Sequence, residues 1–121
     1  MKNKKNSISY NEWEIQTLQG DRELAIEVLR IAMESLDNPE ERGGSLLSIR
    51  AVAEAYGGLG TVAVTAGISR ESLYRALSPK GNPTLKTLVA VLKTLGLRLS
   101  IVDEQKARSK QKKAARRSVA A

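Results

Sequence analysis

The apolar residues in the first half of the chain recur at the three- and four-residue spacing of helices that bury one face. One stripe follows Asp21, a residue able to cap a helix, and comprises Leu24, Ala25, Val28, Leu29, Ala32 and Leu36. A second stripe comprises Leu46, Ile49, Ala53 and Tyr56. It lies between a helix start pattern at 38–41 and the glycines at 57–58. The pattern predicts two helices, the second beginning after Asn38 or, because Gly43-Gly44 weakens the first turn, at Ser45.

The N-terminal residues carry a weaker pattern. Trp13, Ile15 and Leu18 are expected to dock a short segment onto the core, whereas residues 1–10 show no periodicity and are expected to be mobile. We therefore expect a mobile N-terminus, a helical domain over 11–102 and a separate tail at 103–121.

Residues 59–77 have the spacing of two short helices that cross through a tight turn. Ala63 is the small residue four positions before Gly67, and a glycine suits the left-handed backbone that ends a helix. Ser69 is expected to cap the second helix, at about 70–77. Two apolar residues of this pair are expected to point inward: Ile68 and Leu73. An ordinary helical hairpin in a core is the alternative interpretation of the same spacing.

A further helix is predicted after the turn-rich loop at 78–83. Thr84 is its expected cap, Leu85, Leu88, Leu92 and Leu95 its buried stripe, and Gly96 its end. Residues 97–101 then alternate apolar with polar, which predicts a short strand. Because one strand alone is unstable, it would pair with its copy in a symmetric dimer or with a partner's sheet. A coil packed on the core is the alternative.

The net charge of +7 is divided unevenly along the chain. Residues 8–58 hold four arginines against ten acidic residues, whereas 59–102 hold six basic residues against Glu71 alone. This separation favours nucleic-acid binding by the second half, although surface charge can also serve solubility alone. The tail at 103–121 holds seven basic and two acidic residues and is expected to be disordered. It is either a solubilising extension or an arm that follows the phosphates of DNA or RNA.

Composition excludes most catalytic chemistry. The chain has no cysteine and no histidine, which removes thiolates, the usual general base and the commonest metal ligand. We see no convergent cluster of carboxylates or lysines, and therefore expect no enzyme, no metal site and no cofactor. No apolar run approaches the roughly twenty residues of a membrane span, and no hydrophobic segment follows the basic N-terminus as in a secretory signal. These features predict a soluble, cytoplasmic protein without membrane contact.

Three runs in the second half resemble a known family. They are Gly-Ile-Ser-Arg-Glu-Ser-Leu-Tyr-Arg-Ala-Leu-Ser at 67–78, Gly-Asn-Pro-Thr at 81–84 and Leu-Gly-Leu-Arg-Leu at 95–99. In these runs the chain resembles the probable addiction-module antidote proteins, which are helix-turn-helix antitoxins of the lambda-repressor-like, HigA-like class. The resemblance covers about 21–102 and is strongest after Ile68. It implies an all-α, lambda-repressor-like helix-turn-helix domain with N-terminal helices and a short C-terminal strand.

The expected DNA-binding surface is the exposed face of the second motif helix with its surroundings. A helix that presents arginines near its N-terminus fits the major groove, and the resemblance implies that Arg70 and its neighbours meet base edges. The full set is Thr61, Ser69, Arg70, Glu71, Ser72, Tyr74, Arg75, Lys80 and Asn82. Thr61 replaces the longer amide usual in the family, and Val64 occupies a position expected to be polar.

The resemblance implies the antitoxin of a type II toxin-antitoxin module. Such a protein binds its operator as a homodimer, represses its own operon and neutralises a RelE-type ribonuclease toxin, whose basic surface the acidic half at 8–58 would cover. Two alternatives stay open: a stand-alone helix-turn-helix repressor without a toxin, and a general nucleic-acid-binding protein in which the tail dominates. A small basic toxin-like reading frame beside this gene would favour the antitoxin.

Overall fold

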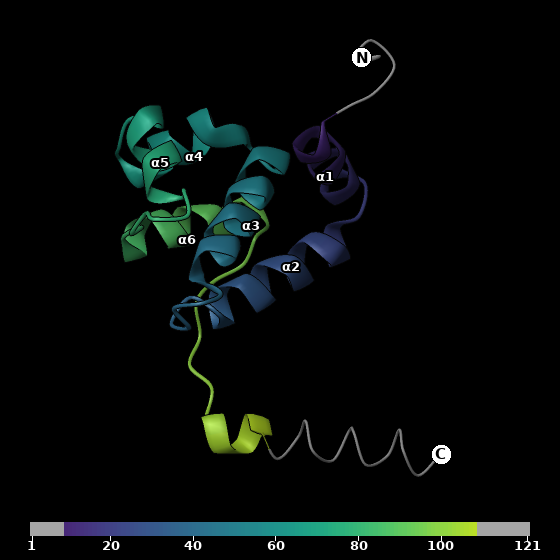
Figure 1. The fold of residues 1–121 in the computed structure, drawn as a ribbon, viewed down its shortest axis with the longest axis vertical. Helices are drawn as coiled ribbons and strands as arrows, with labels where there is room; N and C mark the ends of the chain where they lie inside the picture. The colour runs from purple at the N-terminus through teal and green to yellow at the C-terminus, as the bar shows by residue number, and fades with distance from the viewer. Residues whose placement is uncertain (1–8, 109–121) are drawn as a thin grey trace.

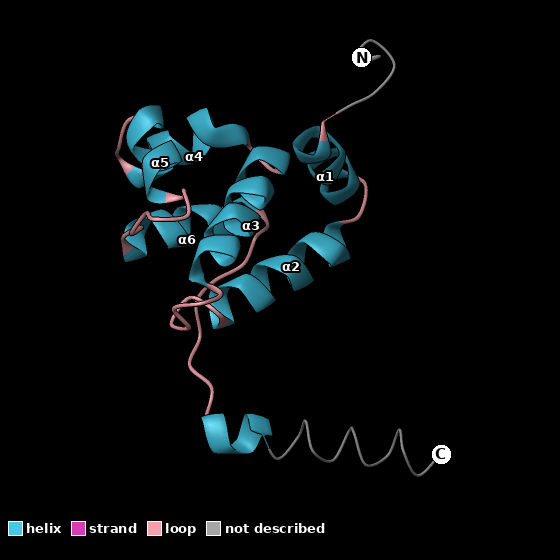
Figure 2. Ribbon diagram, viewed as in Figure 1, coloured by secondary structure: helices cyan, strands magenta, loops and turns pink. Residues whose placement is uncertain are grey.

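The computed structural model describes residues 9–108, which form six helices and one further helical turn at 104–108 (Figure 1). The helices are α1 (Tyr10–Gln19), α2 (Arg22–Glu34), α3 (Arg42–Ala55), α4 (Gly58–Ala66), α5 (Arg70–Ala76) and α6 (Leu85–Thr94). Figure 1 shows α3 between α1 and α2 on one side and the group α4 to α6 on the other. The expected all-helical fold is confirmed for this part of the chain (Figure 2).

The first helix is longer than the short segment predicted there. Ser9 caps it through a capping box: its hydroxyl accepts from the backbone N–H of Glu12 at 3.1 Å, and the Glu12 carboxylate accepts from the Ser9 N–H at 3.1 Å. Of the three residues expected to dock, Leu18 is buried but Trp13 is 52% exposed beside Tyr10. The rest of the expected mobile N-terminus, 1–8, lies outside the described residues.

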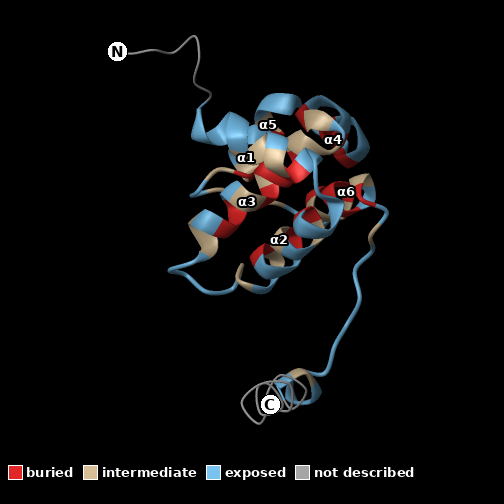
Figure 3. Ribbon diagram, turned by 90° about the vertical axis from the view of Figure 1, so that its right-hand side faces the viewer, coloured by how far each residue is buried: buried red, intermediate tan, exposed pale blue. Residues whose placement is uncertain are grey.

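The predicted stripes of α2 and α3 form much of the core. Ala25, Leu29 and Ala32 of α2 and Leu46, Ile49 and Ala53 of α3 are all buried. Figure 3 shows buried segments, in red, on both helices. Tyr56 is partly buried, and its hydroxyl donates to the carbonyl oxygen of Leu18 at 2.7 Å, which joins α3 to α1. Leu24 departs from the prediction, because it is 38% exposed.

The start of α3 falls between the two predicted positions. The Asn38 side chain accepts from the N–H of Glu40 at 3.0 Å, and its carbonyl accepts from the N–H groups of Glu41 and Arg42. These bonds make 38–41 a turn, so the helix itself begins at Arg42. Asn38 thus shapes the approach to the helix without being its cap.

Helix α6 has the predicted cap but a rotated buried face. The Thr84 hydroxyl accepts from the N–H of Thr87 at 3.2 Å, as expected. Leu92 and Leu95 are buried, whereas Leu85, also expected inside, is 64% exposed. Thr87, Ala90 and Val91 are buried instead. The buried face is therefore set by where α4 and α3 contact the helix.

The predicted strand at 97–101 is wrong, since residues 9–108 contain helices, turns and coil only. The Leu97 N–H bonds the carbonyl of Leu92 at 2.9 Å, and the next backbone bond along the described chain joins Ala107 to Asp103. The intervening segment leads away from the helical body (Figure 1). A strand needs a neighbour for its backbone groups, and one chain offers none here. The alternative interpretation, a coil packed on the core, is correct only for Leu97, which packs against the core. Leu99 is 44% exposed and Ile101 is 97% exposed.

The described start of the expected disordered tail is a single helical turn. The Asp103 carboxylate accepts from the N–H groups of Gln105 at 2.9 Å and Lys106 at 3.2 Å, which caps residues 104–108. Residues 109–121 lie outside the described part, so the tail's role stays a prediction. No helix within 9–108 has both the length and the apolar character required to cross a membrane.

Candidate nucleic-acid interface

Helices α4 and α5 are joined by the turn that the sequence predicts. Gly67 has φ +75°, the Gly67 N–H donates to the Val64 carbonyl at 3.1 Å, and the Ile68 N–H donates to the Ala63 carbonyl at 3.0 Å. This pair of bonds is the usual glycine-dependent helix end. The Ser69 hydroxyl then caps α5 by accepting from the N–H of Ser72 at 3.0 Å. Ile68, expected to point inward, is 36% exposed because it sits at the tip of the turn.

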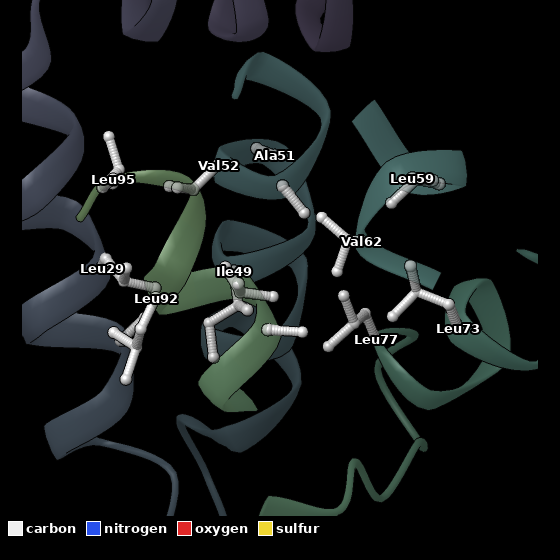
Figure 4. Packing of buried hydrophobic residues seen from close by; sticks show 14 of the residues in the cluster. Leu29, Ile49, Ala51, Val52, Leu59, Val62, Leu73, Leu77, Leu92 and Leu95 are labelled. Atoms are coloured by element: carbon white, nitrogen blue, oxygen red, sulfur yellow. The ribbon is translucent and has the colours of Figure 1, made fainter. Parts of the chain in front are cut away.

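The buried side of α5 anchors the pair to the core. Leu73 and Leu77 are fully buried, and Figure 4 shows their side chains beside Val62 of α4. Ala63, the predicted small residue at the crossing, is 3% exposed. Burial of two leucine side chains contributes about 1.5–3 kcal/mol each, so α5 is held in one orientation despite being only seven residues long.

The opposite side of α5 is open to solvent and positively charged. Four predicted site residues on it are exposed: Arg70, Glu71, Tyr74 and Arg75. Ion pairs within 9–108 are confined to Glu27 with Arg30 and Glu104 with Arg108, so both α5 arginines lack an acidic partner. Arg75 makes one long hydrogen bond of 3.5 Å to the Ser72 hydroxyl.

The remaining predicted site residues differ in their exposure and in whether their side chains are already hydrogen-bonded. Thr61 on α4 and Lys80 in the loop are exposed. The hydroxyls of Ser69 and Ser72 bond each other at 2.9 Å and serve the cap of α5. The Asn82 side-chain oxygen accepts from Arg42 at 3.0 Å, so this residue is engaged in holding its own loop.

The loop after α5 is fixed by contacts that span the fold. Arg42 reaches from α3 to donate to the Gly81 carbonyl at 3.2 Å and to the Leu36 carbonyl at 3.1 Å. The Gly81 N–H donates to the Ser78 carbonyl at 2.7 Å. A Cβ at position 81 would lie less than 3.0 Å from the carbonyl oxygens of Ala76 and Arg75, so the end of α5 packs directly on this backbone. Residues 78–83 therefore set the position of the end of α5.

Sequence reasoning missed two basic residues at this surface. The Arg50 guanidinium of α3 lies 4.3 Å from the ring centre of Tyr74, which is a cation–π contact, and the adjacent Ser78 hydroxyl donates to the Tyr74 carbonyl at 2.7 Å. Nothing local in the sequence indicates this pairing, because 24 residues separate the partners. Lys86 places its ammonium at the turn after α4, where a Cβ on Gly67 would lie 3.1 Å from it. A cation is favoured at that carbonyl end of a helix.

Arg70, Arg75, Lys80 and Lys86 thus lie on or beside the α4–α5 pair. A groove of about 300 Å³ beside α5 is lined by Glu54, Leu59, Arg70, Glu71 and Tyr74. Arginine, tyrosine and glutamate side chains on an exposed helix can bind the donors and acceptors of base edges, and the flanking lysines can bind phosphates.

Comparison with known proteins places the chain in a family. An uncharacterized protein of Haemophilus influenzae is 52% identical over 40 residues, which are 33% of this chain and 41% of that relative. The chain therefore spans less than half the length of that relative. A search of solved structures gives no match. The model of the family described as "Probable addiction module antidote protein" matches residues 10–103, from the start of α1 to the segment beyond α6, and this chain belongs to that family.

Proposed function

We propose that this protein is a DNA-binding antitoxin that binds the operator of its own operon through α5 and acts by binding, not by catalysis. The single observation that supports DNA binding most strongly is the exposed face of α5. Arg70 and Arg75 are both exposed there, and neither has an acidic partner within 9–108. Membership of the antidote family supports the antitoxin role.

The geometry of α5 suits the major groove of DNA. An α-helix with its side chains is about 10–12 Å across, close to the groove width of about 12 Å. Arg70 stands in the first turn, directly after the Ser69 cap, where its guanidinium can make a bidentate contact to a guanine. Lys80 and Lys86 flank the helix, where the phosphate backbones would run.

A homodimer would place two α5 helices one turn of DNA apart, about 34–36 Å, on an inverted repeat. The segment 98–102 is the contact we propose between the two copies. It exposes Leu99, Ile101 and Val102, and its backbone makes no hydrogen bond within 9–108. A two-fold copy would cover both the apolar side chains and the free backbone groups.

The partner we propose is a RelE-type ribonuclease toxin in the cytoplasm, where the operator also lies. The acidic residues of the first half are carried on α1, α2, α3 and the turn before α3, and most of them are exposed. A basic ribonuclease would be attracted to this side and separated from its RNA, while α5 stays free for DNA. The complex would then repress its own transcription.

Titration of the full chain by fluorescence anisotropy tests the DNA-reading proposal. The duplexes are the sequence upstream of its own gene and a scrambled version of the same composition. Arg70→Ala should weaken operator binding by about 5- to 150-fold, which corresponds to roughly 1–3 kcal/mol, and leave scrambled binding nearly unchanged. Arg30→Ala is the matched control, because Arg30 is exposed but lies on α2.

Equal losses on both duplexes would make Arg70 a phosphate contact and contradict its base-reading role. A wild-type chain without any operator preference would refute specific DNA binding altogether and favour the general nucleic-acid-binding alternative. Gene order separates the remaining alternative, since a stand-alone repressor needs no adjacent toxin-like reading frame.

A further inference from the structure

A second surface, away from α5, has the character of a protein-docking groove. It lies between α2 and the start of α3 and has a volume of about 640 Å³. Its lining comprises Val28, Ile31, Ala32, Ser35, Glu40, Glu41, Gly44, Ser45 and Ser48. None of these residues belongs to α4, α5 or α6, so an occupant of this groove would leave the proposed DNA-binding face uncovered.

The α2 wall of this groove carries apolar side chains that the fold leaves in water. Ile31 is 56% exposed and lines the groove with the half-buried Val28, and Leu24, which is 38% exposed and lies outside the lining, extends this row toward the start of α2. This spacing of four and then three residues is that of a helix face prepared for contact. An exposed aliphatic row beside a groove is typical of a surface that binds another protein.

The α3 wall offers small residues, two of which carry a hydroxyl group. Gly44, Ser45 and Ser48 leave room for side chains to enter from outside. Ser45 is 7% exposed, and its hydroxyl is not an enclosed group without a partner, since the described residues contain no such side-chain atom. Its place in the lining lets this hydroxyl meet a polar group of an occupant.

The rim of the groove is acidic and uncompensated. Glu40 and Glu41 line it. The lining includes no lysine or arginine. The nearest arginine in sequence, Arg42, is bound to the carbonyl oxygens of Leu36 and Gly81. An occupant would therefore need apolar residues along its centre and positive charge at its edges.

We infer that this groove receives an amphipathic, basic helix of the toxin, with aliphatic residues against the α2 row and lysines or arginines against Glu40 and Glu41. This inference rests on the proposed function, because it requires a toxin partner. A helix suits the site since α2 extends over 13 residues, about 20 Å, which matches three to four turns of a docked helix with anchors at i, i+3 or i+4, and i+7. Nucleic acid does not suit it, because the glutamates repel phosphates.

The test measures binding of the full chain to the purified product of the toxin-like reading frame beside its gene. Ile31→Asp introduces a charge into the aliphatic row at an exposed position, where folding tolerates it. We expect at least a tenfold loss of affinity, which is the loss of a moderate anchor residue. Val64→Asp is the matched control, because Val64 is 81% exposed on α4, and we expect a change within about twofold.

A second variant tests the charge of the rim. Glu40→Gln combined with Glu41→Gln should slow association severalfold and reduce its salt dependence, because rim charges act mainly on the rate of encounter. Glu14→Gln on α1 is its control. Circular dichroism should be unchanged in every variant, and operator binding should be unchanged in the variants of Ile31, Glu40 with Glu41, and Glu14, since none of these residues belongs to α4 or α5.

The outcomes separate the two proposals. If the wild type binds the toxin and Ile31→Asp binds equally well, the groove inference is wrong while the antitoxin role stands. If the folded wild type does not bind the toxin at all, the antitoxin role fails and the groove inference fails with it. If Ile31→Asp instead changes the sedimentation of the chain alone, the groove holds a second copy and the toxin assignment is overturned.

Discussion

Gly81→Ala is predicted to be the most damaging small substitution in the second half of the chain. The new Cβ would lie less than 3.0 Å from the carbonyl oxygens of Ala76 and Arg75. Both are backbone atoms at the end of α5, so no side-chain rotation relieves the overlap. The loop has to move away from α5, and this movement breaks or lengthens two bonds of Gly81, from its N–H to Ser78 and from Arg42 to its carbonyl.

The expected loss of stability follows from these interactions. Overpacking against unyielding atoms costs about 1–3 kcal/mol, and each broken hydrogen bond adds about 1 kcal/mol. We therefore expect a decrease of about 3 kcal/mol or more in the free energy of unfolding. For a domain of this size that lowers the melting temperature by about 12–24 °C. Operator binding should weaken as well, because the end of α5 moves with the loop.

Gly60→Ala is the matched control, with the opposite expected sign. Gly60 is exposed within α4, and a Cβ there meets no atom within 4 Å. Alanine at such a helical position stabilises by about 0.4–1 kcal/mol, chiefly by restricting the unfolded chain. Thermal and urea unfolding followed by far-ultraviolet circular dichroism measures both variants. If Gly81→Ala melts within about 3 °C of the wild type, the close approach of the loop to α5 is wrong.

Three further predictions concern the second half of the chain. Arg50→Ala should lower the free energy of unfolding by about 0.5–2 kcal/mol and weaken operator binding, because it removes the cation that stacks on Tyr74. Arg50→Lys should restore part of the stability and part of the binding, whereas an unchanged operator affinity of Arg50→Ala would show that the stacking does not position α5. Deletion of residues 103–121 should weaken binding to all duplexes alike. The slope of log binding constant against log salt concentration should become shallower by about 0.9 for each phosphate that the tail neutralises, and an unchanged slope would show that the tail is a solubilising extension. Ile101→Asp should convert a dimer to a monomer in sedimentation velocity, and an intact dimer would move the interface away from 98–102.

The sequence alone determined the features that depend on a few neighbouring residues. Gly67 ends α4 and Ser69 and Thr84 cap α5 and α6 as predicted, because each feature needs only a left-handed backbone or a hydroxyl within three residues of a free N–H. The buried stripe at Leu46, Ile49 and Ala53 was predictable for a similar reason, since helical spacing itself defines the face. The exposed arginines of α5 follow from the same periodicity.

Only the tertiary structure decided what distant segments do to one another. Leu85 and Leu97 both fit apolar patterns, yet the first is exposed and the second packs on the core, because burial depends on where neighbouring helices end. Arg42 and Arg50 belong by sequence to the acidic half, yet they hold Gly81 and Tyr74 across the fold. The segment 97–101 alternates like a strand but forms none in the described chain, since alternation fixes which side chains share a face and cannot supply the second backbone that a strand requires.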